Sequence, residues 1–290
     1  MTTQDIPLRC ADGYPLQATH YPAAGAARGA VVIASALGVP RQFYAAFARF
    51  LAGAGYHAIT FDYRGIGGSR GGPMAGRDMG MQHWGRQDIE AALAWAAQEL
   101  HPPRIYLVGH SAGGQLAGLA SRSERLNGLV CVAATAPHPG LYPATSRWWL
   151  WLLWRVLVPM LSRGRDWFPS RRVGMGPVDV PAGVAREWAR WASRPGYMFN
   201  PDWEVDIGRY SRLRMPVLSY AFDDDAYASF EAVDALLARY SAAPVERLRV
   251  KAGEHGKLGH FGFFRDKHRD TLWAGLVEWL GRSEGMAVAA

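Results

Sequence analysis

Short runs of almost wholly apolar residues alternate with amphipathic stretches along the first 136 residues. The runs GAVVIASA at 29–36 and YHAITFDY at 56–63 are typical of buried strands. Between them, QFYAAFARFLAGAG at 42–55 places apolar residues at helical spacing and ends in glycine, as many helices do. Before them, LRCADGYPLQATHY at 8–21 predicts two strands joined by an Asp12–Gly13 turn. The chain therefore opens as a succession of strands and helices.

The same alternation continues to about residue 136 and returns after residue 210. We expect further strands and helices in both parts: strands at 104–109, 128–134, 215–222 and 245–250, and helices at 84–100, 112–121, 228–240 and 267–281. Repeated strand–helix–strand units are typical of a parallel sheet with helices on both faces. The sequence therefore predicts an α/β fold with a doubly wound, mostly parallel sheet and functional loops at the carboxyl ends of its strands.

The alternation stops between about residues 137 and 210. Eight of the twelve tryptophans fall there, with helical spacing and several prolines among them: 148, 149, 151, 154, 167, 188, 191 and 203. We therefore expect one core made of residues 1–136 and 211–290, interrupted by a helical, tryptophan-rich insertion at 137–210. Most of these tryptophans are expected to pack the insertion onto the core, and a few are expected to line a pocket.

Composition narrows the range of partners. The formal charge is +7, but the arginines are scattered with no run of five or more basic residues, so no nucleic-acid partner is expected. Cys10 and Cys131 form neither a disulfide framework nor a zinc-binding pattern, and we expect no metal and no cofactor. The longest apolar run, at 148–161, is interrupted by Arg155 and Pro159, so no transmembrane segment is expected. Without an export signal at the amino terminus, the expected compartment is the cytoplasm.

A local group of four arginines at 163–172 stands out from the scattered ones. It is compatible with an anionic substrate or a lipid surface, although solvated side chains are the simpler interpretation.

Two serines sit in the pattern G-x-S-x-G, Ser111 in GHSAG at 109–113 and Ser69 in GGSRG at 67–71. A nucleophilic serine of this pattern needs a strand that delivers it, a sharp turn and a helix that follows at once. RIYLVGHSAGGQLAGLA at 104–120 offers all three, whereas RGGPMAGR after Ser69 cannot begin a helix. Ser111 is therefore the candidate nucleophile, and Ser69 is expected to lie in a loop.

A nucleophilic serine needs a base, and the base needs an orienting carboxylate. After a strand–serine–helix turn, the acid and then the histidine follow along the chain. Three acids at 223–225 come at the end of the apolar strand PVLSYAF, and one of them is the expected acid. His260, on the loop before the last helix, is the best placed base, with His255 as the alternative; His268 is expected to face solvent on that helix.

Hydrolysis also requires donors for the oxyanion. One backbone N–H is expected from Ala112, the residue after the nucleophile, and the other from the loop after the strand at 29–36, near Leu37.

These motifs together resemble the α/β-hydrolase fold over nearly the whole chain. FDYRGIGGS at 61–69 is similar to the family's D-x-R-G-x-G-x-S loop, which assigns Ser69 to a structural loop; GHSAGG, PVLSYAFDDDAYA and GHFGFF resemble its nucleophile, acid and histidine segments. The resemblance implies Asp225 as the acid, with Asp224 a close second. It also implies that the insertion forms a cap over the nucleophile.

The chain departs from this family where a His-Gly pair often precedes the oxyanion donor. Here Ser35 and Ala36 take those places, so Leu37 is assigned by position alone. The sequence resembles in particular a bacterial subgroup of predicted serine hydrolases with GVP…FY and a terminal GHFGFF.

The resemblance and the residues together predict a serine hydrolase of carboxylic esters or thioesters. The expected partner is a small-molecule ester with an apolar acyl or aromatic group, because the insertion supplies large apolar side chains. Acyl transfer by the same three residues, or ligand binding without catalysis, are the alternatives.

Overall fold

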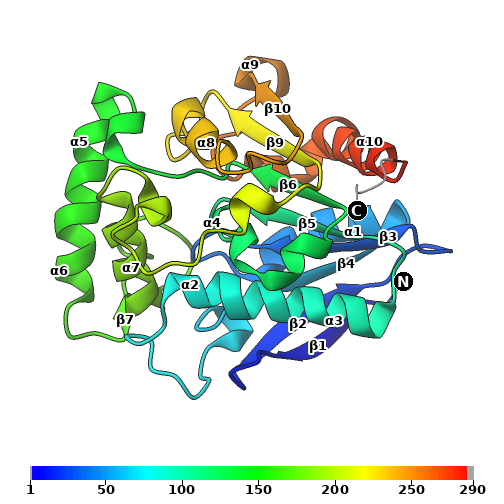
Figure 1. Ribbon diagram of the computed structural model, residues 1–290, viewed down its shortest axis with the longest axis horizontal. Helices are drawn as coiled ribbons and strands as arrows, with labels where there is room; N and C mark the ends of the chain where they lie inside the picture. The colour runs from blue at the N-terminus through cyan, green and yellow to red at the C-terminus, as the bar shows by residue number, and fades with distance from the viewer. Residues whose placement is uncertain (1, 286–290) are drawn as a thin grey trace.

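One eight-stranded sheet forms the centre of the molecule (Figure 1). The computed structural model describes residues 2–285, and within them the strand order is β1-β2-β4-β3-β5-β6-β9-β10. The first strand pairs antiparallel with the second around the predicted turn, the second pairs antiparallel with the fourth, and every other pairing is parallel. The strands are β1 Gln4–Arg9, β2 Pro15–Tyr21, β3 Gly29–Ala34, β4 Tyr56–Phe61, β5 Ile105–His110, β6 Gly128–Val132, β9 Val217–Phe222 and β10 Val245–Val250. The predicted mostly parallel sheet is confirmed.

Helices cover both faces of this sheet, as Figure 1 shows. The α-helices of the core are α1 Ala45–Gly53, α2 Met81–His83, α3 Glu90–Leu100, α4 Ala112–Gln115, α8 Phe230–Leu237, α9 Ala252–His255 and α10 Ala274–Ser283. A π-helical turn at Trp84–Ile89 joins α2 to α3, and another at Arg269–Trp273 leads into α10. The ring of Phe47 in α1 packs 5.3 Å from that of Trp273, so α1 and the last helical segment share one face.

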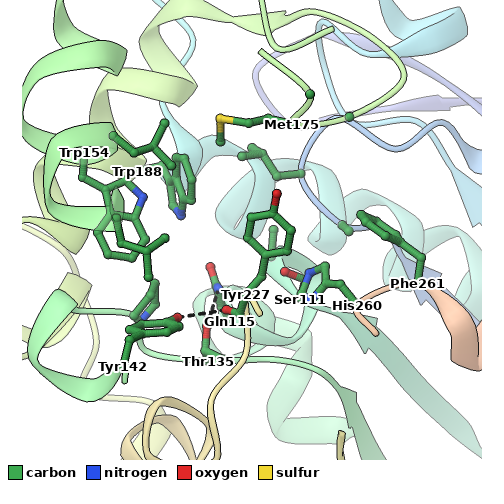
Figure 2. A pocket seen from close by; sticks show the side chains of 18 residues that line it. Ser111, Gln115, Thr135, Tyr142, Trp154, Met175, Trp188, Tyr227, His260 and Phe261 are labelled. Atoms are coloured by element: carbon green, nitrogen blue, oxygen red, sulfur yellow. Dashed lines mark hydrogen bonds between the residues drawn. The ribbon is translucent and has the colours of Figure 1, made fainter. Parts of the chain in front are cut away.

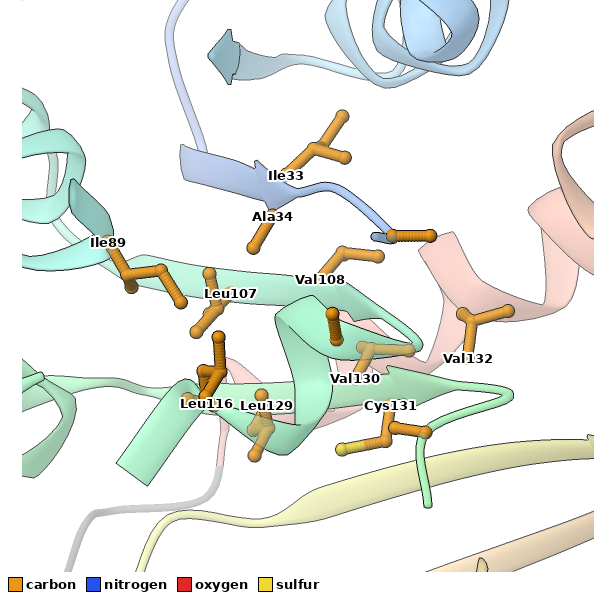
Figure 3. Packing of buried hydrophobic residues seen from close by; sticks show 14 of the residues in the cluster. Ile33, Ala34, Ile89, Leu107, Val108, Leu116, Leu129, Val130, Cys131 and Val132 are labelled. Atoms are coloured by element: carbon orange, nitrogen blue, oxygen red, sulfur yellow. The ribbon is translucent and has the colours of Figure 1, made fainter. Parts of the chain in front are cut away.

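Two of the central strands, β3 and β6, are buried along their whole length. This is why they lack an alternating polar face. Val108 of β5 and Val130 of β6 lie side by side in register, and Figure 3 shows them with Leu116 and Ile89 in one apolar cluster. This packing fixes the carboxyl ends of the strands, where the loops with the candidate residues begin.

The segment between β6 and β9, where the sequence leads us to expect an insertion, is mostly helical. It contains α5 Ala144–Leu152, α6 Val158–Ser162 and α7 Ala182–Ala192, with a π-helical turn at Leu153–Leu157 that makes 144–162 one continuous helical run. Two short strands that the sequence did not predict, β7 Trp167–Phe168 and β8 Val180–Pro181, pair antiparallel. Figure 1 shows α5, α6 and α7 gathered on one side of the sheet, with α5 and α6 outermost.

The helix expected at 112–121 is much shorter than predicted. It ends as an α-helix at Gln115 and continues as 3₁₀ turns at Ala117–Leu119. Glycine lowers helix stability by about 1 kcal/mol per residue relative to alanine, and three glycines fall in this stretch. In addition, the Tyr210 hydroxyl donates to the carbonyl of Gln115, and Gly118 leaves room for that ring, since a Cβ there would lie 2.7 Å from it.

Candidate active site

Ser111 occupies a strained turn between β5 and α4. Its φ of 50° and ψ of −111° lie in a region that L-residues rarely adopt. The turn is so tight that a Cβ at Gly109 would lie 2.4 Å from the nitrogen of Gly114, and one at Gly113 would lie 2.2 Å from the carbonyl oxygen of Ala34. Glycine is therefore required on both sides of the serine, and the turn exposes Ser111 at the carboxyl edge of the sheet.

Ser69 has the surroundings of a structural residue. It is buried, its Oγ donates to the carbonyl of Asp62 at 2.7 Å, and the same oxygen accepts from the N–H of Gln17 at 2.9 Å. Both hydrogen-bonding roles of the hydroxyl are thus filled by backbone groups of the core. The loop that carries it is held further by the buried ion pair of Arg64 with Asp88, at 2.7 Å.

His260 is paired with Asp225. Its Nδ1 lies 2.7 Å from Oδ2 of Asp225, whose other oxygen accepts from the N–H groups of Tyr227 and Ala228 at 2.8 and 3.1 Å. Because a carboxylate only accepts, the proton of the neutral imidazole lies on Nδ1 and leaves Nε2 as an acceptor. Of the two acids that the sequence left open, the one in contact with the histidine is Asp225.

The two neighbouring acids hold the loop that carries His260. The two oxygens of Asp224 accept from the N–H groups of Leu258 and Gly259, at 2.9 and 2.8 Å. Oδ1 of Asp223 accepts from Ala252 N–H at 2.8 Å. All three acids therefore bond to the segment that leads to His260, but only Asp225 contacts its imidazole.

The other candidate histidines lie apart from Ser111. His255 is in α9, where its ring faces that of His268 at 6.4 Å between centroids. The prediction that His268 faces solvent is wrong, because only 2% of the residue is exposed. It lies in a 3₁₀ turn before the last helical segment and is covered by its packing.

His110, next to Ser111, joins two loops that the sequence did not connect. Its Nε2 lies 2.8 Å from the carbonyl oxygen of His260, and its Nδ1 lies 2.8 Å from the hydroxyl of Tyr44. A carbonyl only accepts, so Nε2 carries the proton and Nδ1 accepts from Tyr44. The Tyr44 oxygen in turn accepts from the N–H of Ala36 at 2.9 Å.

This chain of hydrogen bonds is buried and uncharged. Burial, reinforced by the adjacent imidazole of His260, lowers the pKa of His110, which keeps it neutral, as its acceptor role at Nδ1 requires. The chain links the loop after β3, which carries Leu37, to the backbone of His260. No local pattern predicts these hydrogen bonds, because the segments that carry Tyr44, His110 and His260 are distant along the chain.

The two expected oxyanion donors line the same pocket as Ser111. Ala112 is the first residue of α4, where a backbone N–H has no acceptor within the helix. The N–H of Leu37 donates no hydrogen bond to another backbone group of residues 2–285. Both groups are therefore available to a ligand.

The pocket in front of Ser111 has a cavity volume of about 120 Å³ and opens to solvent. Core residues supply one wall, with Ser111 and His260 next to each other in Figure 2 and Gln115 and Thr135 below them. The insertion supplies the other wall, which is apolar: Leu150, Leu153, Trp154, Met175 and Trp188. None of the lining residues described is acidic. The site thus combines a serine, an oriented imidazole and free N–H donors with an apolar pocket.

Two further features of residues 2–285 bear on other chemistries. No three histidine, cysteine, aspartate or glutamate side chains gather closely enough there to hold a metal ion. None of the helices in that range has the length and apolar character needed to cross a bilayer.

Comparison with known proteins places this chain among α/β hydrolases. A family model described as serine aminopeptidase, S33 matches residues 25–170. The fold is similar to that of the alpha/beta hydrolase GrgF from Penicillium sp. sh18, with a TM-score of 0.65, 18% identity and coverage of 99% of this chain and 100% of that one. It is also similar to a thermophilic esterase from Thermogutta terrifontis, with a TM-score of 0.62, 15% identity and coverage of 97% and 99%. At these identities the likeness concerns the fold.

A curated relative matches over a short stretch only. The lysophosphatidylserine lipase ABHD12 of Danio rerio is 38% identical over 65 residues, which make up 22% of this chain and 15% of that protein.

Proposed function

Since the chain belongs to the serine aminopeptidase S33 family and has the α/β-hydrolase fold, we propose that it is a serine hydrolase that cleaves carboxylic esters or thioesters. One observation carries the proposal: Ser111, on its strained turn, lines the same pocket as the imidazole that Asp225 orients.

In the proposed reaction, Ser111 attacks the carbonyl carbon of the ester while Nε2 of His260 takes its proton. Asp225 accepts the Nδ1–H of His260 and stabilises the imidazolium that forms. The same imidazolium then gives its proton to the departing alcohol or thiol. The acyl group remains on Ser111 as an ester, and water, activated by His260, releases it as the carboxylic acid.

The backbone N–H groups of Leu37 and Ala112 hold the negative charge that develops on the carbonyl oxygen. Such a donor typically contributes about 10² to 10³ in rate. The hydrogen bonds from Ala36 through Tyr44 and His110 to His260 set the spacing between this donor loop and the base.

The lining of the pocket favours a neutral acyl group over an amino acid. An aminopeptidase substrate carries an ammonium group that needs a counter-charge when it leaves water, and none of the described lining residues is acidic. The apolar wall from the insertion suits an aliphatic or aromatic acyl chain. We assign residues 137–210 to a cap over the pocket and residues 1–136 and 211–290 to the core.

The test is hydrolysis of p-nitrophenyl esters from acetate to palmitate, with the parent protein and Ser111→Ala side by side. We expect turnover by the parent, near-complete loss in the variant, and a preferred chain length that reports the depth of the pocket. Amino-acid p-nitroanilides should be poor substrates. Turnover that rises when an alcohol is added, with an ester as product, would instead favour acyl transfer by the same residues. A folded parent that is inactive on every ester would contradict the proposal.

A further inference from the structure

The helical run at 144–162 presents a second apolar face to solvent, on the side away from the pocket. Trp148 is 74% exposed, Met160 59% and Trp149 50%, and Trp151, Leu152 and Val156 are also exposed. Of the seven large apolar side chains that are exposed in residues 2–285, these are six; the seventh, Tyr227, lines the pocket.

These side chains form a continuous stripe along the run. Residues 148, 152, 156 and 160 recur at intervals of four, so they lie above one another on one side of the helix. The opposite side holds Leu150, Leu153 and Trp154, which are buried against the rest of the molecule and line the pocket. A helix that is apolar all round is normally covered on both sides. The outer stripe of 144–162 therefore points to a missing apolar partner.

The charges of the helical run itself have one sign. Residues 144–165 contain no acid and four arginines, namely Arg147, Arg155, Arg163 and Arg165; the acid that follows, Asp166, pairs with Arg77 at 3.0 Å. All four are exposed, and no carboxylate of residues 2–285 lies within ion-pair distance of them. Where Arg147 and Arg155 do make hydrogen bonds, the acceptors are the backbone carbonyls of Tyr142 and Ser193.

We propose that this face, the outer side of 144–162 with the arginines that border it, docks on a lipid bilayer with anionic headgroups. Tryptophan is favoured at the boundary between headgroups and hydrocarbon because its ring is apolar and its N–H is polar. Arginines along the same face gain from anionic lipids. A second copy of this chain fits less well, because pairing the stripes would bring two sets of unpaired arginines together.

Docking of this kind places the pocket next to its source of substrate. The helical run separates the docked stripe from the pocket by its own width, since Leu150 and Leu153 line the pocket while Trp148 and Leu152 face outward. An apolar acyl chain would therefore pass from the bilayer to Ser111 around this one helix. This second step rests on the proposed hydrolase function, whereas the docking itself does not.

Vesicle flotation tests the docking separately from the chemistry. The parent protein and Ser111→Ala are mixed with vesicles of phosphatidylcholine, with and without phosphatidylglycerol, and the bound fraction is measured. We expect both proteins to bind the anionic vesicles about tenfold or more tightly than the neutral ones, with binding weakened by added salt. Equal binding by the inactive variant separates this result from the fate of the hydrolase proposal.

Two pairs of substitutions assign the binding to this face. Trp148→Ser with Met160→Ser, and separately Arg163→Ser with Arg165→Ser, should each lower partition onto anionic vesicles by about tenfold or more. The control is Arg125→Ser with Arg214→Ser, which also removes two positive charges but at the amino ends of β6 and β9, away from the pocket. It should change partition less than twofold. All these side chains are exposed, and thermal unfolding confirms that the variants fold.

Three outcomes would overturn the proposal. The first is no binding to either kind of vesicle. The second is an equal loss of binding in the control variant, which would mean that charge acts without regard to position. The third is a dimer in sedimentation that Trp148→Ser with Met160→Ser dissociates, without vesicle binding by the parent, which would make a second copy the occupant.

Discussion

Ser69 and Ser111 occupy the same five-residue pattern, and their surroundings are opposite. Ser69 follows β4 at a distance, is not among the non-glycine residues with positive φ, and its hydroxyl bonds two backbone groups of the core. Ser111 follows β5 directly with a φ of 50°, and its hydroxyl faces a pocket. The short pattern alone therefore does not distinguish the two serines, whereas the strained backbone of Ser111 and its oxygen, unbonded within residues 2–285, support its proposed role as nucleophile.

The two loops also differ in what surrounds them. The loop of Ser69 is held by buried ion pairs, Arg64 with Asp88 and Arg41 with Asp62. The turn of Ser111 is surrounded by neutral groups and by an imidazole whose Nδ1–H faces a carboxylate. In the first loop the charged groups pair with one another and stabilise the fold. In the second, Nε2 of His260 has no partner among the described residues and can accept a proton.

Replacing each serine by alanine gives the largest expected contrast. Ser111→Ala should lower kcat/KM on the preferred ester by about 10⁴-fold or more, with an unchanged melting temperature. Ser69→Ala should leave kcat/KM within about threefold but lower the free energy of unfolding by about 1–3 kcal/mol, because it strands a buried N–H. Ester kinetics and urea unfolding of both variants check the pair. A large loss of activity in a folded Ser69→Ala variant would contradict the assignment of Ser69 to a structural role.

Replacing the two adjacent acids sharpens the account of the base. Asp225→Asn should lower kcat by about 10³- to 10⁴-fold, because an amide no longer holds the imidazole in the required tautomer. Asp224→Asn keeps a carbonyl acceptor for only one of the two N–H groups of the loop, those of Leu258 and Gly259. It should lower kcat about tenfold. The comparison of kcat between the two variants decides the assignment. A greater loss in Asp224→Asn would assign the acid to that residue.

Removing one hydroxyl tests whether Tyr44 positions the site. Tyr44→Phe leaves Ala36 N–H and Nδ1 of His110 without partners and should lower kcat about tenfold with little change in KM. Tyr56→Phe is the matched control, since its buried hydroxyl bonds Glu284 at the far end of the sheet. Both variants should lose stability, but only the first should lose kcat. An equal effect on kcat would reduce Tyr44 to a structural role.

The smallest expected effect is a change in how the free energy of unfolding depends on pH. Folding lowers the pKa of His110, so below about pH 6.5 the unfolded chain binds a proton there that the folded chain does not. The stability that neutral His110 contributes is therefore complete above pH 6.5 and is lost as the pH falls, by at most about 1.4 kcal/mol per pH unit.

Urea unfolding between pH 7.5 and 5.5 measures this slope. His110→Gln should show a shallower slope than the parent, whereas Ser69→Ala should keep the parent's slope because the partners of Ser69 are backbone groups. Identical slopes in the parent and His110→Gln would mean that His110 does not sense pH.

Much of this arrangement follows from local patterns. Buried parallel strands appear as apolar runs, and a strand that ends in Gly-His-Ser-Ala-Gly needs glycines wherever a Cβ would strike the backbone. Ser111 could be preferred to Ser69 from sequence because a strand precedes it and a helix can begin directly after it.

What could not be predicted depends on contacts between distant segments. Asp224 and Asp225 are neighbours in sequence, and only the path of the loop decides which one meets His260. Tyr44 and His110 gave no sign of their bond, which closes only when β3 and β5 pair. The helical run at 144–162 is apolar on all sides, so its sequence alone does not separate the tryptophan that lines the pocket, Trp154, from the exposed Trp148.

Covalent labelling with a fluorophosphonate, followed by mass spectrometry of the modified peptide, tests whether Ser111 is the activated serine. Only a serine that a base activates reacts with this probe at a useful rate. We expect one adduct, on the peptide that contains Ser111, and no adduct in Ser111→Ala. An adduct on the peptide that contains Ser69, or a folded parent that remains unlabelled, would contradict that assignment.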